Sequence, residues 1–274
     1  MAANQAVPVE SNQIQGWPQG PTVSARSAIL IEAETGTILY AKNIHERLAP
    51  ASLTKVLTAL VALKHSSPET MLTASEAIYI DEAGAQLCGL KPGDSMTLNQ
   101  ALYIALLSSS NDAALLIAEN VGGTVENFVE MMNEEARLLG ATNSNFVNPH
   151  GLTEEKQYTT AYDLYLILNE AVKYEKFVEI IQTANYETTY YDTKGTMKQY
   201  SCRSTNKYIN GDVKAPENVT VIGGKTGTTN AAGHCLMVFA KDKNGSPYIA
   251  VILKAGSRDS LYAQMTDLLE EITK

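Results

Sequence analysis

The chain has 274 residues and a formal net charge of −9. Lysine and arginine form no basic stripe, so a nucleic-acid-binding surface is not indicated. Cys88, Cys202 and Cys235 are far apart and form no C-x-x-C pair, which argues against a zinc site and a disulfide framework and leaves open whether any two are bonded. The sequence indicates no metal and no cofactor, and it contains no apolar run long enough for a transmembrane helix.

The first part of the chain is polar and rich in turn-forming residues. Residues 1–24 are therefore expected to be a flexible leader that remains after an export signal has been removed. Residues 25–274 are expected to form a single domain, and no second domain is predicted after it.

Two β-type runs, residues 28–33 and 37–41, flank Gly36 and predict a hairpin. A helix is predicted next, because apolar residues recur at three- and four-residue intervals and Pro50 suits a first turn. These apolar residues are Leu53, Val56, Leu57, Leu60 and Val61.

The middle of the chain is mainly helical in its pattern. Residues 66–92 are broken by glycine and proline and predict loops and short elements. Helices are predicted over 98–107, 113–121, 125–139 and from 159 to about 174, and a hairpin over 186–200. On the helix over 125–139, the residues expected to face inward are Phe128, Met131, Met132 and Leu138.

The carboxyl-terminal part predicts strands over 235–240 and 248–253, then a helix over 261–272. Strands at both ends with helices between them predict an α/β fold. One subdomain is a sheet built from residues of about 25–63 and 218–274, and the other is a mainly helical insertion of about 64–217.

Ser52 and Lys55 lie at the amino end of the first predicted helix, three residues apart and on one face. A serine hydroxyl becomes a nucleophile when a neighbouring base takes its proton, and a lysine can be that base when its pKa is depressed. The helix amino terminus also stabilises negative charge that develops on an oxygen. Taken alone, the same pattern fits a capping serine and a solvated lysine.

Two further motifs corroborate the first. Ser109-x-Asn111 lies in a predicted interhelical loop, and Lys225-Thr226-Gly227 lies where a strand is expected. In this order the three motifs match the set found in serine β-lactamases and penicillin-binding proteins. The flanking stretches 50–55, 109–114, 148–152, 159–163 and 224–229 resemble the low-molecular-mass penicillin-binding proteins that are serine-type D-alanyl-D-alanine carboxypeptidases, from Ala25 to the carboxyl end.

The resemblance implies a transpeptidase or β-lactamase-like fold of the α/β (α+β) class, with an antiparallel sheet flanked by helices and a helical subdomain. It implies removal of the terminal D-alanine from peptidoglycan stem peptides through a Ser52 acyl-enzyme, outside the cytoplasm, with β-lactams as covalent inhibitors. Family members often carry a second, β-rich domain and an amphipathic anchor. Membrane association is therefore expected only through segments absent from this chain.

The resemblance also implies roles for single residues. Lys55 is expected to be the general base, with a pKa depressed by burial and by Lys225, Ser109 to relay a proton, and Asn111 to orient the substrate amide. The backbone N–H groups of Ser52 and Thr228 are expected to form an oxyanion hole. The residues expected to hold the substrate's terminal carboxylate along an edge strand are Lys225, Thr226, Gly227 and Thr228, with Arg258 adding to the positive field.

Two alternatives stay open. A β-lactamase would need a deacylating base such as Glu154 or Glu155, and Ser110 stands where class A enzymes carry aspartate. A sensor would be acylated by β-lactams without turnover. His150, in a predicted turn, is expected to be structural rather than a base.

Overall fold

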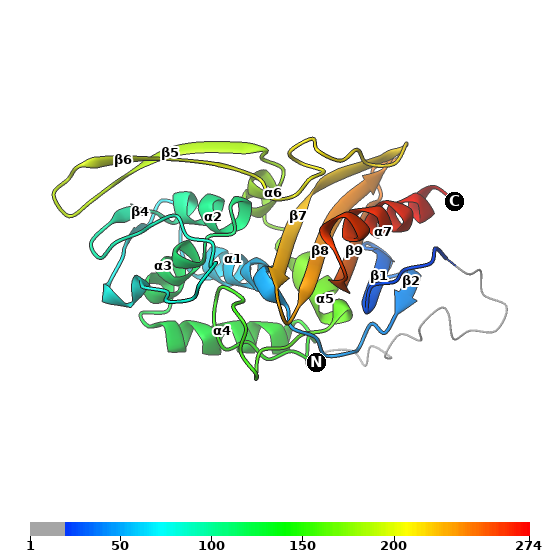
Figure 1. The fold of residues 1–274 in the computed structure, drawn as a ribbon, viewed down its shortest axis with the longest axis horizontal. Helices are drawn as coiled ribbons and strands as arrows, with labels where there is room; N and C mark the ends of the chain where they lie inside the picture. Colours follow the sequence, from blue (N-terminus) through cyan, green and yellow to red (C-terminus); the bar gives the residue numbers. More distant parts are fainter. Residues whose placement is uncertain (1–19) are drawn as a thin grey trace.

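The computed structural model describes residues 20–274 (Figure 1). Most of the predicted leader, residues 1–24, lies outside the described residues. Within its last part, Val23 is buried, and its carbonyl accepts a hydrogen bond of 2.6 Å from Lys42 Nζ.

A five-stranded sheet, in the order β2-β1-β9-β8-β7, organises one half of the molecule. All neighbouring strands are antiparallel, and strand β7 forms an edge. The sheet therefore combines both ends of the chain, as the sequence predicts. Its strands are β1 (Ser27–Glu32), β2 (Ile38–Lys42), β7 (Val219–Thr229), β8 (Gly233–Asp242) and β9 (Pro247–Ala255).

Successive side chains of these strands point to opposite faces and enter two separate cores. On one face, Leu30 and Ile252 pack with helix α7 (Arg258–Glu270). On the other, Ile29 and Val251 join the larger core that contains α1 (Thr54–His65) and α5 (Ala161–Ala171). Figure 1 shows the sheet between α7 and these two helices.

The helical insertion packs around α1, which is buried along most of its length. Two of its helices begin at residues whose side chains cap the first turn. Thr97 and Gln100 form a capping box at the start of α2, and Thr124 caps the start of α4. Three helices of the insertion confirm the sequence prediction in type and place: α2 (Leu98–Leu107), α3 (Asn111–Val121) and α4 (Val125–Leu138). A further helix, α6 (Glu175–Ile181), also lies in the insertion.

A second sheet, in the order β3-β4-β5-β6, lies within the insertion. The predicted hairpin is confirmed as β5 and β6, which extend along the outside of α2 in Figure 1. Strands β3 and β4 were not predicted, because three residues are too few to show an alternating pattern. The strands are β3 (Met71–Thr73), β4 (Ser95–Thr97), β5 (Asn185–Tyr191) and β6 (Met197–Arg203).

Several details differ from the sequence prediction. Helix α3 begins at Asn111 and α7 at Arg258, and both begin earlier than predicted. Their N-cap residues are Ser110 and Ser257. Helix α6 was not predicted. Leu138 is 67% exposed, so its expected inward position is wrong; it lies on the last turn of α4.

The three cysteines are free. No helix within residues 20–274 is both long and apolar enough to cross a bilayer.

Candidate active site

Ser52 lies in a short 3₁₀ turn, η2 (Ala51–Leu53), which leads directly into α1. Ala51 has a φ of 46°, a left-handed conformation that is uncommon for a residue with a Cβ. The Thr54 hydroxyl donates a 2.8 Å hydrogen bond to the Ala51 carbonyl and so fixes this strained turn. Ser52 is thus held at the amino end of a buried helix, as the sequence predicts.

Lys55 is 1% exposed, and its Nζ lies within hydrogen-bond distance of three oxygens. These are Ser52 Oγ at 3.0 Å, Asn111 Oδ1 at 2.7 Å and the His150 carbonyl oxygen at 2.6 Å. The last two can only accept. A neutral amine therefore uses its two N–H groups on them and leaves its lone pair for the Ser52 hydroxyl, which donates.

Burial lowers the pKa of Lys55 well below its usual value, and the nearby Lys225 lowers it further, while Asp112 acts in the opposite direction. Its hydrogen-bond partners within residues 20–274 are all uncharged, so none of them is a carboxylate that would stabilise the ammonium form. The direction and both lowering causes agree with the sequence-based expectation.

Ser109 and Asn111 lie where α2 gives way to α3. Ser109 has a φ of 66° and is 7% exposed, and its Oγ accepts a 2.9 Å hydrogen bond from Lys225 Nζ. Lys225 also donates to the carbonyl of Thr226, at 3.0 Å, and burial lowers the Lys225 pKa to about 7. The second and third motifs therefore touch each other, and Asn111 joins the second motif to Lys55.

The Lys225-Thr226-Gly227 motif lies on edge strand β7, beside the Ser52 turn. A Cβ on Gly227 would approach Ser52 N to 3.0 Å, so glycine lets the strand lie close to the nucleophile's backbone. The Thr226 hydroxyl shares a 2.7 Å hydrogen bond with that of Thr205, and Thr228 Oγ1 lies 3.4 Å from His234 Nδ1.

The turn around Gly151 closes the other side of the Ser52 turn. Gly151 has a φ of 91°, and a Cβ there would lie 1.9 Å from the Ala51 carbonyl oxygen. Burial, with the nearby Lys55, lowers the pKa of the His150 imidazole to about 3, and its Nδ1 accepts a 3.2 Å hydrogen bond from Leu152 N. The His150 ring therefore stays neutral, while its backbone carbonyl contacts Lys55.

The structure brings most of the predicted residues together: Ser52, Lys55, Ser109, Asn111, Lys225, Thr226, Gly227 and Thr228 lie on the segments just described. Arg258 is exposed at the first residue of α7. Burial raises the pKa of Tyr262, and the charge of Arg258 partly offsets that rise. Tyr262 Oη donates to the Thr205 carbonyl at 3.5 Å, and these interactions link Arg258 to the margin of the site at Thr205.

Some residues of the site were not identified from the sequence. These are Thr205, His234 and the carbonyl of His150. Thr205 and His234 belong to no recognised motif, and a backbone carbonyl carries no residue-type signal. The stretch 148–152, which carries part of the family resemblance, was the one sequence feature that pointed to the region of His150.

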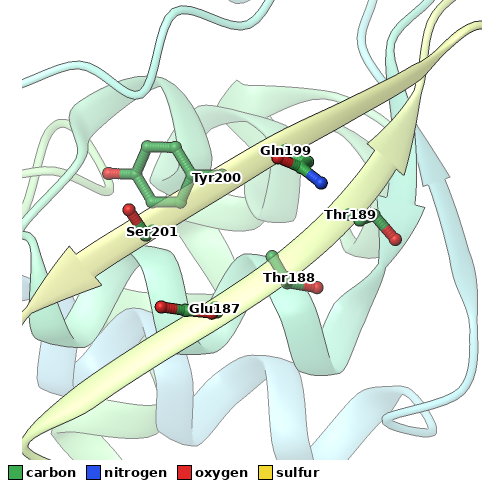
Figure 2. Close-up of a pocket in the computed structure, with 6 residues that line it drawn as sticks. All are labelled: Glu187, Thr188, Thr189, Gln199, Tyr200 and Ser201. Atoms are coloured by element: carbon green, nitrogen blue, oxygen red, sulfur yellow. The ribbon is translucent and has the colours of Figure 1, made fainter.

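Two of the cavities formed by residues 20–274 lie outside this cluster or at its edge. Figure 2 shows the residues that line one of about 560 Å³, on the β5–β6 hairpin: Glu187, Thr188, Thr189, Gln199, Tyr200 and Ser201. The other, of about 400 Å³, is lined by His150 together with the exposed Glu154 and Glu155.

Comparison with known proteins agrees with this arrangement. A family model described as D-alanyl-D-alanine carboxypeptidase matches residues 14–257. The chain is 38% identical to D-alanyl-D-alanine carboxypeptidase DacF of Bacillus subtilis over 250 residues, covering 90% of this chain and 61% of the relative. It is 30% identical to a D-alanyl-D-alanine endopeptidase of Pseudomonas aeruginosa, covering 92% and 78%.

A crystal structure of the Streptomyces K15 DD-transpeptidase superposes with a TM-score of 0.85 at 27% identity, covering 93% of this chain and 98% of that one. The chain spans about three fifths of the length of the first curated relatives, namely 61, 62 and 58%. The family match and the shared fold agree with the three motifs, and the chain belongs to the D-alanyl-D-alanine carboxypeptidase family.

Proposed function

We propose that this protein is a serine-type D-Ala-D-Ala carboxypeptidase that removes the terminal D-alanine from peptidoglycan stem peptides through an acyl-enzyme on Ser52. One observation carries the proposal most strongly. Lys55 is buried, its pKa is lowered, and its two N–H groups have acceptors, so its lone pair is free for the Ser52 hydroxyl at 3.0 Å.

In acylation, Ser52 Oγ attacks the carbonyl carbon between the two D-alanines while its proton passes to Lys55 Nζ. The backbone N–H groups of Ser52 and Thr228 stabilise the oxyanion that forms. The departing D-alanine nitrogen must then gain a proton. Ser109 supplies it as a relay: its hydroxyl gives its proton to the nitrogen and takes one from the ammonium of Lys225, whose Nζ lies 2.9 Å away, while the proton on Lys55 returns to Ser52 Oγ when the ester is hydrolysed. Water then hydrolyses the Ser52 ester and restores the free enzyme.

Substrate selection follows from the edge strand. An extended peptide can pair with the free side of β7, while Lys225, Thr226 and Thr228 hold the terminal carboxylate by charge-assisted hydrogen bonds. Thr205 extends this hydroxyl row through Thr226. Arg258 contributes to the field from the margin, and Asn111 orients the substrate amide.

The proposal has consequences for partners and location. β-Lactams would acylate Ser52 as covalent inhibitors. Because the proposed substrate is peptidoglycan, the protein would act outside the cytoplasm, in the cell envelope. The β-lactamase alternative has less support, because Glu154 and Glu155 are exposed and Ser110 stands at the middle of the second motif. A sensor would lack peptide turnover.

The experiment is cleavage of the terminal D-Ala–D-Ala bond, measured as release of D-alanine from the acid peptide and of D-alaninamide from the same peptide amidated at its carboxyl end. We expect kcat/KM to be at least about tenfold lower for the amide, because a charge-assisted hydrogen bond contributes about 1.5–3 kcal/mol. Ser52→Ala is the negative control. Equal cleavage of acid and amide would contradict the carboxylate subsite, and no release from either would contradict the proposed activity.

A further inference from the structure

Three consecutive serines join α2 to α3, and only the middle one, Ser109, faces Lys225. Ser108 Oγ and Ser110 Oγ lie 3.0 Å apart, so the two flanking side chains meet each other. Ser110 is fully buried at the N-cap of α3 but makes no capping hydrogen bond. Its hydroxyl is instead directed to Ser108.

The proton count of Ser108 fixes the directions in this cluster. Ser108 Oγ donates its one proton to the Ile104 carbonyl, at 2.7 Å. It must therefore accept in its contacts with Ser110 Oγ and Tyr200 Oη, the latter at 3.0 Å. Tyr200 thus donates to the centre of the cluster that flanks Ser109. Figure 2 shows its ring extending from β6 with the hydroxyl at the far end.

The hairpin that carries Tyr200 is itself fixed to α2. Gln100 Nε2 donates to Thr188 Oγ1 at 2.7 Å and to the Thr189 carbonyl at 2.6 Å. Just beyond β6, Thr205 N donates to the Leu107 carbonyl at 3.0 Å. Tyr200 is therefore held at a defined position relative to the end of α2, where the serine turn begins.

Ser109 needs such support, because a left-handed conformation is unfavourable for a residue other than glycine and persists where its surroundings impose it. We propose that Tyr200 is a positioning residue for the reaction proposed above. Its hydroxyl, through Ser108 and Ser110, holds Ser109 in the left-handed conformation that places Ser109 Oγ against Lys225. This inference rests on the proposed role of Ser109.

The test compares Tyr200→Phe, which removes only the hydroxyl, with Tyr190→Phe on the partner strand. Tyr190 is a matched control because its ring is buried, and no hydrogen bond joins it to Ser108 or Ser110 within residues 20–274. Rates are normalised to the amount of Ser52 that penicillin titrates, which removes any difference in folded fraction. We expect Tyr200→Phe to lower kcat roughly three- to tenfold with KM unchanged, and Tyr190→Phe to change neither by more than about twofold.

A double variant separates positioning from general structural damage. If Tyr200 acts through Ser109, Tyr200→Phe should have no further effect in a Ser109→Ala background. An equal fall in both backgrounds, or no fall in the wild-type background, would overturn the inference. If Ser109→Ala alone leaves kcat unchanged, the proposed role of Ser109 fails and the inference with it. The penicillin acylation rate, measured in parallel, gives the same comparison even if the peptide is not cleaved.

Discussion

Lys55 and Lys225 are each 1% exposed, and among the residues that the structure describes neither has a carboxylate as a hydrogen-bond partner. Burial disfavours the ammonium form, and for Lys55 it outweighs the opposing effect of the nearby Asp112, so both pKa values fall. The consequences differ. Lys55 is suited to accept a proton from Ser52, whereas Lys225, with a pKa of about 7, is charged or neutral according to the ambient pH.

At the residue scale, Lys55→Arg should abolish most of the acylation, because a guanidinium stays protonated and cannot serve as a base. We expect the rate of penicillin acylation to fall by about 10²–10⁴. Lys64→Arg, on the same helix, is the control, since it keeps a cation beside Glu135. Acylation of Lys55→Arg at the wild-type rate would exclude Lys55 as the base.

The Lys225 pKa predicts a pH dependence of substrate binding. Below about pH 7 the amine is protonated and attracts the terminal carboxylate; above it, the charge and the attraction are lost. KM for the acid peptide should therefore rise as pH increases through and beyond 7. The amidated peptide should show no such rise. Parallel KM profiles for the two peptides would contradict a charge interaction with Lys225.

At the scale of elements, the Ser52 turn lies between two glycines from distant parts of the chain. Gly151 approaches it from the 148–152 turn and Gly227 from β7, and a Cβ at either position would meet the backbone of the turn or the atoms next to it. The strained conformation of Ala51 is thus supported on both sides.

Replacing Gly151 by alanine tests this support. Gly245, in the β8–β9 turn, has nearly the same φ, 90° against 91°, but nothing within 4 Å of an added Cβ. We expect Gly245→Ala to cost about 1–2 kcal/mol of unfolding free energy. Gly151→Ala should cost about 1–3 kcal/mol more, because of the added clash, and should slow acylation as well. Denaturant unfolding and penicillin acylation measure the two effects, and equal losses in both variants would contradict close packing at Gly151.

The sequence predicted elements best where their periodicity was long. The helices from Leu98 to Leu138, the terminal hairpins and the position of the third motif on a strand are confirmed. Strand β4 has three residues and helix α6 follows α5 with no glycine or proline between them, so neither carried a local signal. The start of α3 was missed because Asn111 and Asp112 are typical of loops, whereas here Asp112 accepts hydrogen bonds from Cys88, Gly89 and Leu90.

At the scale of the whole molecule, the site combines segments that are far apart in the chain. Its members come from η2 and the first turn of α1, the α2–α3 junction, the 148–152 turn and β7, which meet between the five-stranded sheet and the helical insertion. Three ordered motifs predicted the main residues of this candidate site from the sequence. Thr205 and Tyr200 depend on how the chain folds back, so no local pattern could reveal them, and the 148–152 stretch indicated the turn of His150 but not the contact of its carbonyl with Lys55.

The most direct test of the central claim is the intact mass of the protein after exposure to a penicillin. The proposed chemistry predicts a mass increase equal to one penicillin per chain, and no increase for Ser52→Ala. Ser66→Ala, which replaces the serine that follows α1, should gain the same adduct as the wild type. An adduct of full stoichiometry on Ser52→Ala would contradict Ser52 as the nucleophile and, with it, the mechanism proposed for this protein.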